Sequence, residues 1–325
     1  MSVRDIAQKA GLGRVAYHLL YRPWNNLRDC MREGGPLQQR RTERGRRDME
    51  QAASRLPALA PADSTRAPLA LHLLTGRRFW YQSAFCLWSF AQHAQRRIAP
   101  VIYDDGTLAE EQRATLAGLF PLARFVPREE TLRRLDEHLP VARFPALRER
   151  WEHYPNIRKL TDIHTGATGW KLVIDSDLLF FRRPSLLIKW LDKPAHPLHA
   201  VDIENSYGYS RPLLDSLAGA PLADYVNVGL CGLNSGELDW EKLEYWCRVL
   251  MEKEGASYYL EQALVAMLVA GRECTVAPAS NYVTLPRPPE ALACEAVMHH
   301  YVAESKRWYF QRNWFHVLTA AQKPG

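Results

Sequence analysis

The sequence has no apolar run long enough to cross a membrane and no secretion signal. A membrane-spanning helix needs roughly 18 consecutive apolar residues, and no stretch of the 325 residues approaches this length. Residues 1–24 carry scattered charges and lack an apolar core followed by a small-residue cleavage site. The composition, with 47% hydrophobic and 24% charged residues, is typical of a globular protein. We therefore expect a cytoplasmic protein.

Signatures of cysteine metal sites and of nucleic-acid binding are also missing. The six cysteines include no C-x-x-C pair, so they predict neither a zinc site nor a redox motif, and reduced thiols are the simplest interpretation. No zinc finger or RNP pattern is present, and the basic residues are not interleaved with aromatic residues. We therefore expect no nucleic-acid partner.

The net charge of +6 is concentrated near the start of the chain. Residues 1–50 hold 11 Lys/Arg and 6 Asp/Glu, a difference of five. Residues 38–51 (QQRRTERGRRDMEQ) predict a charged helix or tether, and residues 53–68 read as a Pro/Ala-rich linker. A basic arm can attract anionic lipid headgroups, although such a charge run is more often only a solvated face. Peripheral contact with the inner membrane face through this arm is therefore one expectation to test.

From about residue 68 the sequence alternates between predicted strands and predicted helices. The predicted strands cover residues 68–76, 99–106 and 123–127, and the predicted helices cover residues 79–95, 108–120 and 128–139. This alternation predicts a mostly parallel sheet with helices on both faces, and such sheets bind ligands beyond the carboxyl ends of their strands. We expect a basic, helical extension and linker over residues 1–66, one large α/β domain over 67–318 and a short tail over 319–325.

The stretch LVIDSDLLFF, residues 172–181, places two carboxylates inside an apolar run. The run predicts a buried strand, in which Asp175 and Asp177 must be hydrated, hydrogen-bonded or bound to a cation. At a strand end, residues two apart share a face, so both carboxylates could converge on one hard cation. The alternative is a strand that ends at Ile174, followed by Asp-Ser-Asp as a plain turn. Taken alone, these residues favour the alternative.

Polar residues recur at other predicted element ends. Thr75-Gly76 and Asp104-Asp105 follow the first two strands, so three strand ends would line one crevice together with the D-x-D motif. Glu261-Gln262 lies near the start of a helix predicted over residues 256–271. A first-turn acid is stabilised by the helix dipole, which would explain Glu261 but not Gln262.

In order along the chain, four motifs resemble those of glycosyltransferase family 8, the glycogenin-like retaining enzymes of GT-A fold. They are a D-x-D after an apolar strand (Asp175, Asp177), an N-x-G within residues 224–236 (Asn227, Gly229), an acid-Gln pair at a helix start (Glu261, Gln262) and a final H-x-x-x-x-x-K-x-W (His300, Lys306, Trp308). Lys159 in IRKLTDIH matches a basic residue that reaches the donor in this family. The resemblance covers approximately residues 68–310.

The resemblance implies a Rossmann-like GT-A domain that transfers a sugar from a nucleotide-diphosphate sugar, with a UDP-sugar favoured, to an acceptor hydroxyl with retention. It implies that Asp175, Asp177 and His300 bind Mn²⁺ or Mg²⁺, which suits a set of carboxylate oxygens and one imidazole. It assigns Asp177, Glu261 and Gln262 to catalysis. The residues that it assigns to nucleotide and donor binding are Thr75, Gly76, Asp104, Asp105, Lys159, Ser176, Asp202, Asn227, Gly229 and Lys306.

The acceptor and the retaining mechanism stay open at this point. Envelope polysaccharide, a lipid-linked saccharide, a protein or a small molecule could accept the sugar, and aromatic residues suited to stacking on sugars occur in residues 153–156, 205–212 and 312–325. Retention could use Glu261 as a carboxylate nucleophile. It could instead use front-face attack, with Gln262 supporting the oxocarbenium-like centre.

The sequence also departs from the family pattern. The first strand ends in LLTGRRFW instead of an acidic residue, and Ala303 and Arg307 occupy positions where the family has Gly and Pro. Two other classes therefore remain as alternatives. One is a non-catalytic sugar-nucleotide-binding or scaffold protein. The other is a phosphotransferase of the haloacid-dehalogenase type, whose D-x-D motif expects Thr or Val at the position of Leu179.

Overall fold

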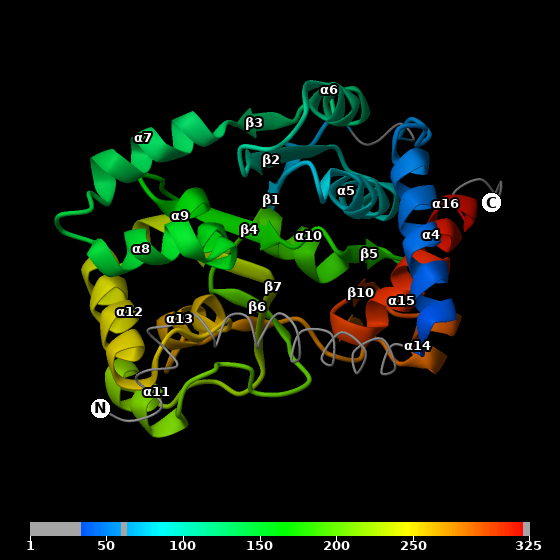
Figure 1. Ribbon diagram of the computed structural model, residues 1–325. Coiled ribbons are helices and arrows are strands. Elements are labelled where there is room, and N and C mark those ends of the chain that lie inside the picture. Colours follow the sequence, from blue (N-terminus) through cyan, green and yellow to red (C-terminus); the bar gives the residue numbers. More distant parts are fainter. Residues whose placement is uncertain (1–33, 60–63, 321–325) are drawn as a thin grey trace, which may run out of the picture.

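The computed structural model describes residues 34–59 and 64–320 and is built around one seven-stranded sheet (Figure 1). Its strand order is β3-β2-β1-β4-β7-β6-β8. β7 runs antiparallel to both of its neighbours, whereas the other pairings are parallel. The strands of this sheet are β1 (Leu69–Thr75), β2 (Ile98–Asp104), β3 (Arg124–Val126), β4 (Trp170–Ile174), β6 (Leu198–Val201), β7 (Val226–Asn234) and β8 (Thr275–Val276). The prediction of an α/β fold with a mostly parallel central sheet is confirmed.

Helices cover both faces of the central sheet. Leu172 and Ile174 of β4 belong to a core that contains α5 and α10, whereas Val173 packs with Ile163 of α9. Successive side chains on a strand point to opposite faces, so these two cores lie on opposite sides of the sheet. The helices are α4 (Pro36–Ala53), α5 (Trp80–Ala94), α6 (Glu110–Leu119), α7 (Arg128–His138), α8 (Pro145–His153), α9 (Arg158–His164), α10 (Ser185–Asp192), α11 (Arg211–Ala218), α12 (Trp240–Glu254), α13 (Leu260–Leu268), α14 (Pro288–Ala293), α15 (Lys306–Trp308), the π-helix η5 (Tyr309–Asn313) and α16 (Trp314–Ala320).

The stretch 172–181 is two strands and not one. β4 ends at Ile174, and β5 (Leu178–Phe180) belongs to a separate three-stranded sheet. In that sheet β10 (Met298–His300) pairs antiparallel with β5 and parallel with β9 (Tyr282–Thr284). The interpretation as one continuous strand is wrong, and the alternative of a strand that ends at Ile174 is confirmed, because the chain leaves the central sheet at Asp175 to start the second sheet.

Helix α4 forms within the predicted charged segment and packs on the α/β body. Met49, Ala53 and Leu56 are buried in the same core as β1 and α5. Gly45 lies against the backbone of Phe310 in η5, where a Cβ atom would collide with the Phe310 carbonyl. The residues before 34 in the predicted extension lie outside the described residues. The boundary at residue 66 stays a prediction.

One predicted boundary differs from the structure. The helix predicted over residues 256–271 is shorter, because α13 begins at Leu260 and ends at Leu268. Helix α16 continues to Ala320, residues 321–325 lie outside the described residues, and the tail over 319–325 stays a prediction. Among the helices of residues 34–59 and 64–320, none combines the length and the apolar character that a membrane crossing requires.

Candidate functional site

A cavity of about 620 Å³ opens at the carboxyl ends of β1, β2 and β4. Thr75, Asp105 and the turn after β4 contribute to its wall from these strand ends. The opposite wall comes from later parts of the chain, including β7, the start of α13 and the residues after β10. The predicted crevice at three strand ends therefore exists, and residues more than 200 positions apart in the sequence face one another across it.

The Asp175-Ser176-Asp177 turn connects the two sheets. The Asp175 backbone N–H donates to the Gly229 carbonyl at 2.8 Å, which ties the start of the turn to β7. At its end, the Tyr301 backbone N–H donates to the Asp177 carbonyl at 3.0 Å. Because β5 then pairs with β10, the partner of Leu178 in the register is His300. The turn and the carboxylate convergence, which the sequence presented as alternatives, therefore occur together.

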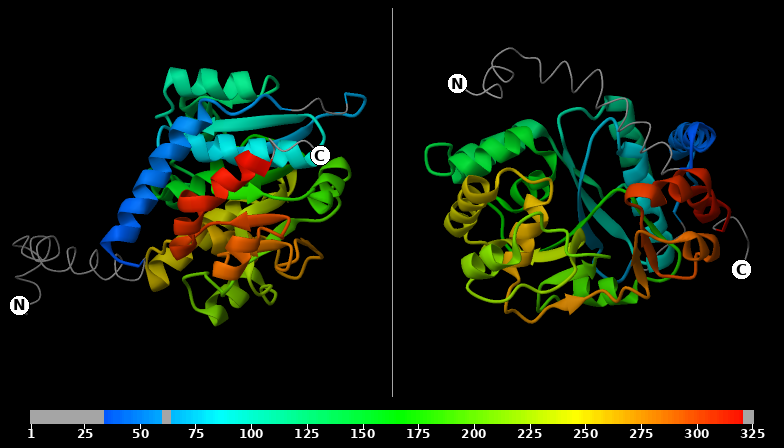
Figure 2. Two further views of the ribbon diagram at one scale, coloured as in Figure 1. Left: turned by 90° about the vertical axis from the view of Figure 1, so that its right-hand side faces the viewer. Right: turned by 60° about the horizontal axis from the view of Figure 1, so that its bottom comes forward.

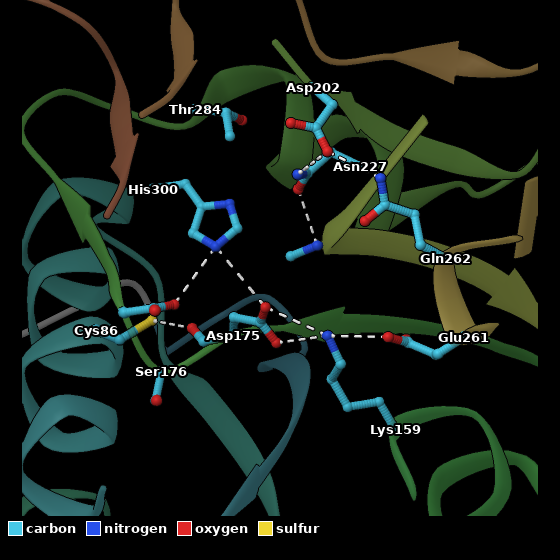
Figure 3. Close-up of polar contacts among 12 residues, drawn as sticks. Cys86, Lys159, Asp175, Ser176, Asp202, Asn227, Glu261, Gln262, Thr284 and His300 are labelled. Atoms are coloured by element: carbon cyan, nitrogen blue, oxygen red, sulfur yellow. Dashed lines mark hydrogen bonds and ion pairs between the residues drawn. The ribbon is translucent and has the colours of Figure 1, made fainter. Parts of the chain in front are cut away.

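Asp175, Asp177 and His300 converge on one point of the cavity wall. Figure 3 shows Asp175 and His300 facing each other there. One ligand atom from each of the three lies within 4.8 Å of the others. The His300 Nε2 atom is 3.4 Å from Asp177 Oδ1 and 3.8 Å from Asp175 Oδ2. Gly229 makes room for this arrangement, because a Cβ atom there would collide with the His300 imidazole. The donor set of two carboxylates and one imidazole fits a divalent cation such as Mn²⁺ or Mg²⁺.

The environment of Asp177 keeps its carboxylate ionised. Burial alone would raise its pKa, but the hydrogen bond and charge of His300 and the nearby Lys306 ammonium lower the pKa below its usual range. Lys306 Nζ is 3.3 Å from Asp177 Oδ2 and extends from the start of α15. An ionised Asp177 is the form that a metal ligand requires.

Lys159 connects Asp175 to Glu261 (Figure 3). Its Nζ atom lies 2.9 Å from Asp175 Oδ1 and 3.5 Å from Glu261 Oε2. Burial alone would lower the pKa of Lys159, but the two carboxylates raise it, so the side chain is charged. Burial raises the pKa of Glu261 to about 7, although Lys159 opposes the shift. Glu261 can therefore gain or lose a proton near neutral pH.

A second polar cluster surrounds Asp202. Its Oδ2 atom accepts hydrogen bonds from Gln262 Nε2 at 2.8 Å and from Asn227 Nδ2 at 3.1 Å. Asn227 Oδ1 in turn accepts from the Gly229 backbone N–H at 2.9 Å. These bonds fix the orientation of the Gln262 amide, whose oxygen lies on the side of the group away from Asp202. All of these residues line the cavity.

The two aspartates after β2 have different positions. Asp105 lines the cavity, and its carboxylate occupies the space that a side chain at Gly76 would need. Asp104 does not line the cavity. Its carboxylate accepts from the backbone N–H groups of Gly106 and Leu108 and pairs with Arg113 at 3.1 Å, so it holds the loop. Gly76 also does not line the cavity and acts by accommodating Asp105.

Two aromatic residues at the cavity rim, Tyr258 and Tyr259, were not singled out in the sequence. Tyr258 and Tyr259 line the cavity with 67% and 40% of their surfaces exposed, and their rings are 5.3 Å apart. Tyr154 stacks edge-on against Tyr258 at 5.8 Å. Of the aromatic segments suggested for an acceptor, residues 154–156 and Ser206 reach the cavity. The described part of the third segment, residues 312–320, does not reach it, and Trp314 there packs against Phe85 in the core.

The backbone at the rim is strained at two non-glycine residues. Ala303 has φ of 45° and Leu285 has φ of 53°, and both line the cavity. Such values lie in the left-handed region that disfavours residues with a Cβ atom. Ala303 is the position at which the resembled family has glycine, so the strain follows directly from this departure.

The comparisons with known proteins give structural matches only. No family model and no curated protein matches the sequence. The galactosyltransferase LgtC, in complex with donor and acceptor sugar analogues, matches with a TM-score of 0.49 and 15% identity over 79% of this chain and 98% of that chain. Mouse xyloside xylosyltransferase 1 matches with a TM-score of 0.46 and 14% identity, over 72% of this chain and 97% of that chain. The bifunctional glycosyltransferase WbbM matches with a TM-score of 0.47 and 12% identity, over 81% of this chain and 53% of that chain. At these identities the likeness concerns overall structure.

Proposed function

We propose that this protein is a metal-dependent glycosyltransferase of GT-A fold that moves a sugar from a nucleotide-diphosphate sugar to an acceptor hydroxyl. The observation that carries the proposal is the convergence of Asp175, Asp177 and His300 at the strand ends, inside a cavity that Lys306 and Lys159 also enter. Acids alone are common at strand ends. Acids, an imidazole and two ammonium groups in one cavity suit a ligand that carries both phosphates and a cation.

Asp175, Asp177 and His300 would hold Mn²⁺ or Mg²⁺. A bound divalent cation supplies stabilisation of the negative charge that grows on the diphosphate as the sugar leaves. Lys306, with 41% of its side chain exposed and its ammonium beside Asp177, would contact the diphosphate as a point charge. Its short distance to Asp177 supports a diphosphate position next to the cation-binding residues.

The donor would extend from the ends of β1 and β2 to the Asp202 cluster. Thr75 and Asp105 would contact the nucleoside, with Gly76 allowing the position of Asp105. The carboxylate of Asp202 and the amides of Asn227 and Gln262 supply acceptors and donors suited to sugar hydroxyls. The family resemblance favours a UDP-sugar as this donor.

Retention could proceed by either of two routes. Glu261 is buried beside Lys159 and has a carboxylate, as a nucleophile of a double displacement requires. Gln262 has an amide whose orientation Asp202 fixes, as front-face attack would need. Replacing Glu261 with Gln separates the routes: full turnover without a trapped glycosyl-enzyme would eliminate the covalent route through this residue.

The acceptor would approach over Tyr258 and Tyr259. These exposed rings lie at the mouth of the cavity and directly precede α13, the helix that carries Glu261. Aromatic rings bind the apolar faces of sugars, so a saccharide or a lipid-linked saccharide suits this rim.

The test is hydrolysis of UDP-, GDP- and dTDP-sugars with and without Mn²⁺. We expect one nucleotide to be released in a metal-dependent manner, and Asp177→Asn to abolish the release. The matched control is Asp239→Asn. Asp239 caps α12 away from the cavity, its side chain accepting from the Lys242 backbone N–H, and Asn caps helices equally well.

Two outcomes would contradict the proposal. If the wild type neither hydrolyses nor binds any nucleotide-sugar in the presence of Mn²⁺ or Mg²⁺, the enzyme proposal fails. If the wild type binds a nucleotide-sugar tightly but never turns it over with any acceptor, the non-catalytic binding protein would be the better description.

A further inference from the structure

Helix α4 carries a row of arginines on its outward face. Leu37, Arg40, Arg41, Arg44 and Arg47 are all exposed. Their spacing of three and four residues places them on one side of an α-helix. Leu37 is 72% exposed, which is unusual for a leucine on a helix that is otherwise packed.

The opposite side of α4 is fixed to the protein. Met49 is fully buried, and Gly45 contacts the backbone of Phe310. Gln311 of η5 donates to Thr42 Oγ1 at 2.8 Å and to the Gln38 carbonyl at 3.3 Å. The arginine row therefore belongs to a held helix with a defined outward face.

Other helices of the C-terminal part lie beside α4 (Figure 2, left). Phe315 on α16 is 55% exposed, and Arg312 of η5 is also exposed. η5 packs against α4 on one side and continues into α16 on the other. We call the outward side chains of these helices the α4 surface; its residues are Leu37, Arg40, Arg41, Arg44, Arg47, Arg312 and Phe315.

Two exposed acids of α4, Glu43 and Asp48, offset only part of the charge of these arginines. Arg44 has a distant ion pair with Asp48 at 3.9 Å, and Arg47 donates to the backbone carbonyl of Glu43. Within the part of the chain that the structure describes, Arg40 and Arg41 have no ion pair or side-chain hydrogen bond. The sequence of residues 1–33, directly before α4, adds six Lys/Arg against three Asp/Glu.

We propose that the α4 surface docks on an anionic lipid bilayer. Arginines bind lipid phosphates, each contributing on the order of 1 kcal/mol near an anionic surface, and Leu37 and Phe315 would enter the boundary between headgroups and acyl chains. A nucleic acid would use aromatic rings as stacking platforms between the basic residues. Here Phe315 lies on the neighbouring helix and the residue within the arginine row is a leucine, which favours lipid.

The docked face lies next to the cavity. α15 begins at Lys306, which lines the cavity, and α15 packs on α4. Docking would therefore bring the cavity near the bilayer, where a lipid-linked acceptor is found. The docking itself does not depend on the proposed reaction, so its test needs no substrate.

The test is co-sedimentation of the full-length protein with vesicles of phosphatidylcholine alone or with about one third phosphatidylglycerol. We expect binding only to the anionic vesicles, and loss of that binding in about 0.5 M salt because salt screens the charges. The variant Arg40→Gln/Arg41→Gln/Arg47→Gln should lower the partition coefficient by roughly 100-fold. Leu37→Ser/Phe315→Ser should lower it at every salt concentration at which the wild type still binds.

The matched control is Arg133→Gln/Arg248→Gln/Lys253→Gln. It removes the same charge from α7 and α12, on the other side of the molecule from α4 (Figure 1), and should bind as the wild type does. Equal binding by the α4 variant and the wild type, or no binding by the wild type, would overturn the proposal. Binding of single-stranded RNA that the α4 variant alone loses, with no vesicle binding, would assign the surface to nucleic acid instead. An unchanged thermal unfolding midpoint of the α4 variant verifies its folding without any substrate.

Discussion

Glu244 and Glu261 are both buried glutamates, yet their surroundings differ in kind. The Glu244 carboxylate, on α12, accepts hydrogen bonds from the backbone N–H groups of Ala146 and Leu147 at 2.8 and 2.9 Å, and so caps the start of α8. Asp162 nearby accepts from Trp151 Nε1 at 2.6 Å. In this α8–α12 region, the Glu244 and Asp162 carboxylates both accept from N–H donors that hold two helices together, although burial still raises the pKa of Asp162 to about 6.

The cavity contains the opposite arrangement. Asp175 and Asp177 bring two like charges together, burial raises the pKa of Glu261, and Ala303 holds a strained backbone. Each of these features is unfavourable for folding and useful for binding a cation and a charged ligand. The comparison indicates that the α8–α12 region stabilises the fold, whereas the cavity retains groups that a ligand must satisfy.

The largest difference should appear between Asp175→Asn and Asp162→Asn. Asp175→Asn should lower metal-dependent donor hydrolysis by at least about 1,000-fold, because it removes one proposed metal ligand. Its free energy of unfolding should change by less than about 1 kcal/mol, since a lost like-charge contact offsets the lost ion pair with Lys159. Asp162→Asn should keep its turnover. Initial rates and urea unfolding of both variants check this. A large loss of turnover in Asp162→Asn would contradict the distinction between the cavity and the α8–α12 region.

Glu244→Gln should lose stability and keep its activity. Gln has one acceptor oxygen for two N–H donors, so one donor is left buried without a partner, at a loss of about 2–3 kcal/mol. Urea unfolding measures the loss. Glu241→Gln on the same helix, at an exposed position paired with Arg143, should change stability by less than about 0.5 kcal/mol. Equal effects of the two substitutions would show that the cap across α8 is unimportant.

Glu261→Gln should reveal how much stability the protein loses when the buried Glu261 carboxyl ionises at higher pH. Burial raises the pKa of Glu261 from 4.5 to about 7, so between these values the folded protein keeps a proton that the unfolded chain has lost. The wild type therefore loses stability as pH rises through this window, whereas Gln cannot ionise. The compared quantity is the free energy of unfolding of Glu261→Gln minus that of the wild type. We expect this difference to be about 1–2 kcal/mol larger at pH 8 than at pH 4.5.

Urea unfolding at the two pH values measures this difference. Glu149→Gln is the control, because Glu149 is exposed on α8 and should give the same difference at both pH values. A stability advantage of Glu261→Gln that stays constant with pH would contradict the raised pKa.

The smallest effect concerns the backbone. Ala303→Gly should stabilise the protein by up to about 1 kcal/mol, because glycine adopts φ of 45° without a Cβ penalty, although it loses more conformational entropy. Ala114→Gly in the exposed middle of α6 should instead destabilise by about 1 kcal/mol. Thermal unfolding of the two variants shows whether each substitution raises or lowers stability. A loss of stability in Ala303→Gly would exclude backbone strain at the rim.

Much of the fold could be predicted because it depends on neighbours in the sequence. The apolar run before Asp175 predicted β4, and the alternation of apolar and amphipathic segments predicted the order of β1, α5, β2 and α6. The run 172–181 was predicted as one strand because periodicity cannot show where a strand leaves its sheet. That depends on which partner β5 finds, and its partner is β10, more than 100 residues later.

The site was less accessible to local reasoning. The family resemblance, and not periodicity, pointed to His300, Lys306 and Lys159. Nothing near Tyr258 or Tyr259 in the sequence distinguishes a cavity wall from an ordinary surface, whereas the position of Asp105 after a predicted strand did place it at the crevice. The assignment of the cavity residues to metal, donor and acceptor stays a prediction until the variants above are measured.

The sequence by itself therefore determined the elements: where apolar runs form strands, where acids follow them and which face of α4 is charged. These depend on side-chain chemistry within a few residues. Only the tertiary structure decided that the D-x-D turn faces His300, that Lys159 joins Asp175 to Glu261, and that α4 presents its arginines beside η5 and α16. Such contacts join residues far apart in the chain, and they exist only when the whole core packs and sets the register between the two sheets.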